Sequence, residues 1–81
     1  MKMTQSPSDY PTRVRRRVRV ALAEHEISAS EMARRCGWTQ SYISRRMAGR
    51  SPFDVADLAR IAEELGIGVS SLTAEPAEAV A

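Results

Sequence analysis

The chain has 81 residues, 43% of them hydrophobic and 5% aromatic, which suits one small domain with a modest helical core. It has no run of about 18 apolar residues to span a membrane, and residues 1–11 lack the apolar stretch of a signal peptide. The single cysteine, Cys36, excludes an internal disulfide and fits a reducing cytoplasm. The net charge of +2 divides into +7 over residues 1–50 and −5 over residues 51–81, which favours one face for a polyanion.

Residues 1–11 are expected to form a flexible arm, and the first helix is predicted to start at Thr12 and to fade near His25–Glu26. It carries an apolar stripe with helical spacing, made of Val14, Val18, Ala21 and Leu22. Its other faces carry a set of arginines, at positions 13, 15, 16, 17 and 19. We expect one or two of them to contact a polyanion and the rest to be solvated.

The second helix has a strong start signal, because Ser28 is followed three residues later by Glu31, the pattern of a capping box. It is predicted to run to about Cys36, where Gly37 supplies the left-handed residue that commonly ends a helix. Ala29, Met32, Ala33 and Cys36 share its apolar face. A third helix follows at once, with Thr39 as its cap, residues 40–48 as its body and Gly49 as its stop.

Asp54 is the predicted cap of a fourth helix that ends at Gly66. Its expected buried stripe consists of Val55, Leu58, Ile61, Ala62 and Leu65. A short helical turn over residues 69–73 returns Leu72 to the core, and the acidic residues 74–81 are expected to be disordered. The fold class is therefore all-α with five helices, and residues 12–73 form the domain. Two short helices joined by Gly37, Trp38 and Thr39 must cross steeply, which is helix-turn-helix geometry.

These residues resemble the Cro and phage-repressor type of helix-turn-helix domain, the lambda-repressor-like fold. The resemblance covers residues 12–73 and is carried by Ala33, Gly37, Ile43 and Gly49, followed by Ile61-Ala62 and Leu65-Gly66. It implies a sequence-specific DNA-binding regulator that is usually dimeric on a palindrome. The chain departs from the family at Glu26, where a glycine often ends the first helix, and at Arg46, where an apolar residue is common.

The third helix is expected to present a reading face to the major groove. On a helical wheel, Ile43 and Met47 point inward while Arg45 points the opposite way. The positions that match the base-contacting residues of the family are Gln40, Ser41, Ser44 and Arg45. Arginine forks to guanine, glutamine pairs with adenine and serine serves either. The alternative is a solvated polar face with no partner, which the enclosing helix-turn-helix disfavours.

Other polar residues of this region receive weaker roles. Tyr42 is interpreted as either a phosphate contact or a cover for the core edge, and Arg46 as either a phosphate clamp or a base reader. The predicted phosphate contacts, which position a protein without reading sequence, are Arg50, Ser51, Arg35 and Arg17. Exposed charges at His25, Glu24 and Glu63-Glu64 form no catalytic or metal-binding pattern, so we expect no enzyme activity, metal or cofactor.

The sequence therefore predicts a transcriptional regulator that binds double-stranded DNA, and it favours a repressor of the phage immunity or Cro type over an activator. Two alternatives stay open, namely an antitoxin whose DNA-binding domain also binds a toxin, and a helical protein-interaction module. The expected partners are a palindromic operator, a second copy that pairs weakly on DNA through the fifth helix, and, for the antitoxin, another protein. No membrane partner is expected.

Overall fold

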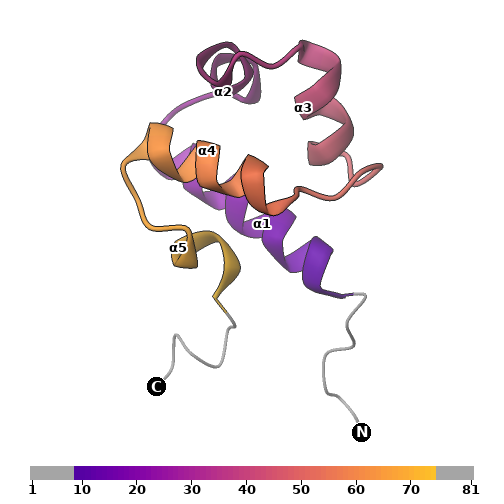
Figure 1. Ribbon diagram of the computed structural model, residues 1–81, viewed down its shortest axis with the longest axis vertical. Helices are drawn as coiled ribbons and strands as arrows, with labels where there is room; N and C mark the ends of the chain where they lie inside the picture. Colours follow the sequence, from indigo (N-terminus) through magenta and orange to yellow (C-terminus); the bar gives the residue numbers. More distant parts are fainter. Residues whose placement is uncertain (1–8, 75–81) are drawn as a thin grey trace, which may run out of the picture.

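The computed structural model describes residues 9–74, and these residues form five helices and no strand (Figure 1). The helices are α1 (Asp9–Glu24), α2 (Ala29–Cys36), α3 (Gln40–Met47), α4 (Val55–Leu65) and α5 (Ser70–Thr73). The predicted all-α, five-helix fold is thus confirmed. Residues 1–8 of the predicted arm and residues 75–81 of the predicted tail lie outside the described residues. Every helix within residues 9–74 is too short or too polar to cross a bilayer.

Helix α1 begins at Asp9, three residues before the predicted start at Thr12. Pro11 lies in the first turn of the helix, where a proline costs little because the first N–H groups of a helix have no partner inside it. Asp9 also places a negative charge at the positive end of the helix dipole. The start of α1 was therefore predicted too late.

One fully buried side chain from each helix forms the centre of the core, namely Val18, Met32, Ile43, Ile61 and Leu72. The predicted stripes of α1 and α2 pack around them, with Ala29 and Cys36 half-buried at the edge. Val55 was assigned wrongly to the buried stripe of α4, since it is 78% exposed. It is the first residue of α4, and helical side chains lean toward the N-terminus, so its side chain extends past the helix.

Four helices end in the same hydrogen-bonded turn, in which a left-handed residue follows the last helical turn. Gly37, Gly49 and Gly66 occupy this position with φ of 76°, 85° and 70°. At the end of α1 the position is taken by Glu26, with φ of 56°. Its N–H donates to Ala23, and the next N–H, of Ile27, donates to Leu22. The turn at Glu26 is thus the same as the glycine turns, but it carries a side chain that disfavours the left-handed region.

Glu26→Gly should raise the free energy of unfolding by about 0.5–1 kcal/mol, because glycine removes the left-handed penalty and gives back part of the gain through a more flexible unfolded chain. The matched control is Gly37→Ala, which has open space for a Cβ and therefore tests the backbone alone. It should lower the free energy of unfolding by about 1 kcal/mol. Chemical denaturation of both variants checks the pair, and a destabilised Glu26→Gly would contradict the assignment of strain to this turn.

Candidate nucleic-acid interface

Helices α2 and α3 are joined by a three-residue turn, and each of its residues has a role in the local structure. Gly37 ends α2 in the left-handed conformation, and the Thr39 hydroxyl accepts a hydrogen bond from the Tyr42 N–H to begin α3. Trp38, between them, lies half-buried with its ring centre 5.0 Å from that of Tyr42. Figure 1 shows α2 nearly end-on while α3 runs down the view, so the two helices cross steeply, as the short turn requires.

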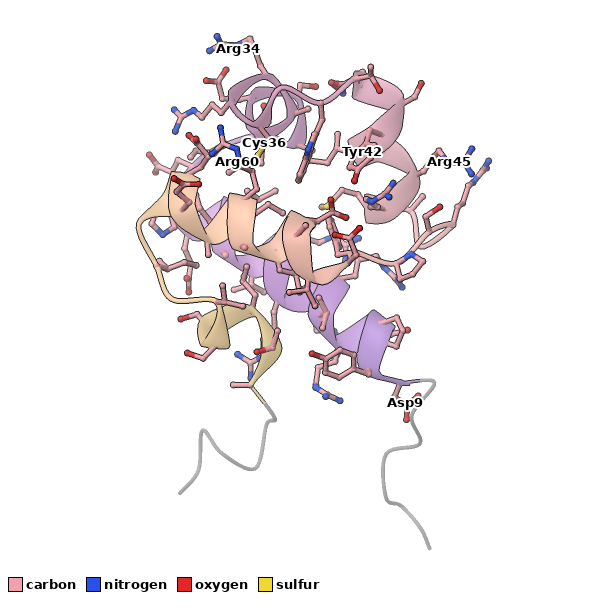
Figure 2. The ribbon with its side chains drawn as sticks, viewed as in Figure 1. Asp9, Arg34, Cys36, Tyr42, Arg45 and Arg60 are labelled. Atoms are coloured by element: carbon pink, nitrogen blue, oxygen red, sulfur yellow. The ribbon has the colours of Figure 1, made fainter. Side chains whose placement is uncertain are left out.

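The outer face of α3 carries the four predicted base-contacting residues, and all four are exposed: Gln40, Ser41, Ser44 and Arg45. Arg45 extends away from the domain in Figure 2. The Gln40 amide nitrogen donates to the Ser30 hydroxyl of α2 at 2.8 Å. This bond leaves the amide oxygen and a second N–H of Gln40 for an external partner. The sequence therefore predicted correctly which side of α3 faces solvent.

The inner face of α3 is tied to α4 through the carboxylate of Asp57, which is only 3% exposed. Tyr42 donates its hydroxyl to this carboxylate at 2.6 Å, and Arg46 donates its Nε at 2.9 Å. The Arg46 guanidinium also lies 3.7 Å from the centre of the Tyr42 ring. Asp57 in turn completes a capping box with Asp54, since each side chain accepts from the N–H of the other residue. One carboxylate thus joins the start of α4 to the middle of α3.

The hydrogen bonds of this cluster determine the protonation states of Asp57 and Tyr42. Burial raises the pKa of the Asp57 carboxyl, but the bonds from Tyr42, the Asp54 N–H and Arg46 outweigh burial and hold the pKa below its ordinary value. The bond to Asp57, and to a smaller extent burial, raises the pKa of the Tyr42 hydroxyl. Asp57 is therefore a carboxylate and Tyr42 a neutral donor at neutral pH.

Tyr42 and Arg46, for which the sequence left two roles open, both bind Asp57 inside the domain. For Tyr42 the geometry favours the core-edge alternative. The ion pair between Arg46 and Asp57 was not predicted, although Arg46 stands at a position where family members commonly have an apolar residue. The signal that was missed is the Asp54-x-x-Asp57 spacing, which is the capping-box pattern with aspartate in the second position.

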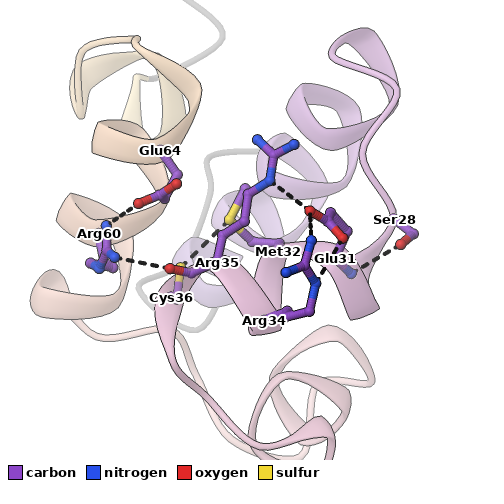
Figure 3. Close-up of polar contacts among 8 residues, drawn as sticks. All are labelled: Ser28, Glu31, Met32, Arg34, Arg35, Cys36, Arg60 and Glu64. Atoms are coloured by element: carbon purple, nitrogen blue, oxygen red, sulfur yellow. Dashed lines mark hydrogen bonds and ion pairs between the residues drawn. The ribbon is translucent and has the colours of Figure 1, made fainter.

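The capping box predicted for α2 forms only in half. Ser28 accepts from the Glu31 N–H at 3.0 Å, but the Glu31 carboxylate binds Arg34 and Arg35 instead of reaching back (Figure 3). Hydrogen bonds from Arg34 and then Arg35 lower the pKa of Glu31. Arg35, a predicted phosphate contact, keeps a side chain that is 40% exposed despite this pairing.

Two arginines satisfy carbonyl oxygens at the ends of α2 and α3. One guanidinium nitrogen of Arg60 in α4 donates to the Arg35 carbonyl at 3.0 Å, and the other forms an ion pair with Glu64 (Figure 3). Arg19 of α1 donates to the Met47 carbonyl at 3.2 Å. Cations at the C-terminal ends of helices are favoured by the helix dipole. These contacts fix α2 and α3 against the rest of the domain, and neither was predicted.

The predicted phosphate contacts lie in three different places, of which Arg35 on α2 is one. Arg50 is exposed and Ser51 half-buried in the loop that directly follows α3. Arg17 instead lines a groove between α1 and α5. The arginines of α1 that approach the end of α3 are Arg19 and Arg15, whose guanidinium lies against Gly49. Helical periodicity could not choose among five arginines, because only the packing of α1 on α3 decides which side matters.

The profile of the HTH_3 family, described as helix-turn-helix, matches residues 18–72, which include α2, the turn, α3 and α4. The chain belongs to this helix-turn-helix family. No curated protein sequence is significantly similar to it. This helix-turn-helix protein has the fold of a crystal structure from Neisseria titled "hypothetical transcription factor NHTF", with a TM-score of 0.79 and 21% sequence identity over 99% of this chain and 92% of that one.

The second helix of the helix-turn-helix motif is α3, and its exposed face carries the donors and acceptors described above. Within residues 9–74 no three His, Cys, Asp or Glu side chains gather as metal ligands would. Burial raises the pKa of the half-buried Cys36 thiol, whose sulfur lies 3.5 Å from that of Met32, so it is protonated at neutral pH.

Asp57→Asn should lower the free energy of unfolding by about 2–4 kcal/mol at neutral pH, because Arg46 loses its buried counter-charge. The pKa of Asp57 is lower in the folded chain than in the unfolded one. Its contribution is therefore present at neutral pH and is lost as the pH falls below about 4. The variant should consequently lose less stability than the wild type when acidified.

Tyr42→Phe is the matched control, since it removes one hydrogen bond of about 1 kcal/mol and keeps the carboxylate with its acid dependence. Thermal melts between about pH 7 and pH 3 compare the three proteins. If Asp57→Asn loses stability in acid as steeply as the wild type, Asp57 is not the group that titrates.

Proposed function

We propose that this protein is a sequence-specific regulator of transcription that binds double-stranded DNA with α3 in the major groove. The observation that carries the proposal is the outward face of α3, where Gln40, Ser41, Ser44 and Arg45 are exposed beside one another. The helix-turn-helix family and the transcription-factor title of the similar fold support it. We propose a repressor, since a domain that occupies a promoter needs no further surface to block it.

In this proposal the residues of the outward face divide the reading between them. Arg45 forks to the O6 and N7 of a guanine, and Gln40 pairs with an adenine near the start of α3. The hydrogen bond that the Gln40 amide nitrogen donates to the Ser30 hydroxyl limits the directions that the amide can take. Ser41 and Ser44 are short, so the helix approaches the base edges closely. Tyr42 and Arg46 keep α3 in place from behind.

Phosphate contacts come from the rim of this face, at Arg50, Ser51 and Arg35. A hollow of about 130 Å³ beside the end of α3 is lined by Arg15, Ser51 and Gly49, among others. We assign it to a backbone phosphate, with Arg15 in place of the Arg17 expected from the sequence. Binding to a palindrome then requires two copies with α3 helices about 34 Å apart, one helical turn of DNA.

Affinity for duplex DNA should fall steeply with salt, because phosphate contacts release counterions. With about four to eight contacts, the logarithm of the association constant should change by about −0.9 per contact for each unit of log salt. Fluorescence anisotropy with a labelled duplex at several salt concentrations measures this slope. A nearly flat dependence would contradict DNA binding by this face.

Three single variants distinguish a base-reading residue, a phosphate contact and a core residue of this interface. Arg45→Ala should fold normally, lose about 1–3 kcal/mol on the cognate duplex and relax preference at one base pair. Arg50→Ala should weaken binding to cognate and scrambled duplexes alike. It should also reduce the salt slope by the value of about one phosphate contact. Ile43→Ala should instead lower the melting temperature, because it removes a core side chain worth about 2–5 kcal/mol.

Selection from a random pool of duplexes supplies the cognate site, and each variant is then measured for melting and for binding to cognate and scrambled DNA. Equal loss on both duplexes by Arg45→Ala would make Arg45 a phosphate contact and the assigned reading face wrong. An enriched sequence that is a single, unpaired site would argue against binding as a pair.

A further inference from the structure

A groove of about 460 Å³ follows α1 on the side of α5. Its α1 wall includes Arg16, Val20 and Glu24, and its opposite wall is formed by Ile67 and Ser71. No described residue that lines it belongs to α2 or α3. Figure 1 shows α5 and α3 on opposite sides of the α1–α4 layer. The groove is therefore a second surface, distinct from the reading face.

Three exposed residues of the α1 wall form a row with a charge pattern that is complementary to itself. Arg16, Val20 and Glu24 are spaced four residues apart, so they lie one above the other along the helix. A cation stands at one end, an anion at the other, and Val20, which is 49% exposed, lies midway. Turning a second copy of this row through half a rotation about Val20 brings each charge opposite its counter-charge.

We infer that this groove is where two copies of the protein pair, with their α1 helices antiparallel about a twofold axis at Val20. Arg16 then lies opposite the partner's Glu24, and Val20 meets the partner's Val20, so that one surface patch serves both copies. A parallel arrangement would set arginine against arginine. The inference goes beyond the proposed DNA binding and does not depend on it, since its tests need no DNA.

The row on α1 determines the orientation of a partner in a way that α5 does not. Helix α5 has four residues, Ser70–Thr73, and none of them is charged. The exposed apolar residue beside it is Val69, at 38%. A small patch without charges does not fix how two copies align, whereas the pairing of Arg16 with Glu24 does. The contact predicted from the sequence at the fifth helix is thus moved to α1, with α5 at its edge.

Cross-linking tests the axis directly, because a residue on a twofold axis meets its own copy. Val20→Cys in a Cys36→Ala background should form a disulfide-linked dimer under mild oxidation and at protein concentrations that populate the pair. Val55→Cys in the same background, on the 78% exposed start of α4, is the control for random collisions and should stay largely monomeric. Efficient cross-linking of Val69→Cys without that of Val20→Cys would overturn the inference in favour of α5.

Charge exchange provides a second test that does not depend on cysteine. Arg16→Glu and Glu24→Arg should each weaken self-association in low salt by about tenfold, as two like-charge pairs form across the axis, and the double variant should return to within about threefold of the wild type. Sedimentation equilibrium measures the association constants of the wild type, the two single variants and the double variant. A wild type that stays monomeric at millimolar concentration, or a double variant no better than the single ones, overturns the inference, and a groove for an acidic protein would then be the alternative.

Binding of the same variants to a single half-site separates the two proposals. It should remain within about threefold of the wild type, because neither residue belongs to the reading face. Loss of DNA binding by the wild type with intact cross-linking at Val20 would overturn the DNA proposal alone. Intact DNA binding with no cross-linking would overturn the pairing surface alone.

Discussion

The carboxylate of Asp57 determines how helix α3 is oriented on the domain. The apolar contacts of α3 with the core come from the fully buried Ile43 and the half-buried Met47. A polar anchor is added to them, since Tyr42 and Arg46 both donate to Asp57. Hydrogen bonds to a charged group have a narrow range of distance and angle, whereas apolar contacts do not. The direction of the outer face therefore depends on a buried ion pair more than on the amount of apolar surface.

The same cluster explains why α3 divides its polar residues between two tasks. Tyr42 and Arg46 are four residues apart and face α4, while Ser41, Ser44 and Arg45 lie on the far side. Asp57 also accepts the Asp54 N–H, so the residue that begins α4 is bound to the residue that holds α3. Cooperation of this kind makes the start of α4 and the placement of α3 a single structural event.

Local features of the fold could be predicted from the sequence because their causes are local. Gly37, Gly49 and Gly66 end helices through their own backbone conformation, and Thr39 begins α3 with a hydrogen bond three residues away. The Asp57 cluster could not be predicted in this way. Its hydrogen bond to Tyr42 spans fifteen residues and depends on how α4 crosses α3, which no periodicity within either helix contains.

The arginines of α1 were ambiguous for the same reason. A helix with cations on nearly every side gives the same pattern whichever way it packs, and only contact with Met47 and Gly49 separates Arg19 and Arg15 from Arg17. The exposed side of α3 was predictable because its opposite side is apolar. The partners of charged residues required the tertiary structure.

The positive charge of the first fifty residues overstates the charge available to DNA. Among residues 9–74, Arg34 and Arg35 share Glu31, Arg46 is held by Asp57, and Arg19 is bound to a helix end. These contacts use part of the positive charge to hold α2 and α3 in place, although Arg35 keeps a side chain that is 40% exposed. On the outer face of α3 the cation is Arg45, which extends from the domain and, within the described residues, has no ion pair there. A single outward guanidinium among short neighbours suits selection of one base pair better than general attraction to phosphate, because sequence-independent affinity needs many cations and specificity needs one that is well placed.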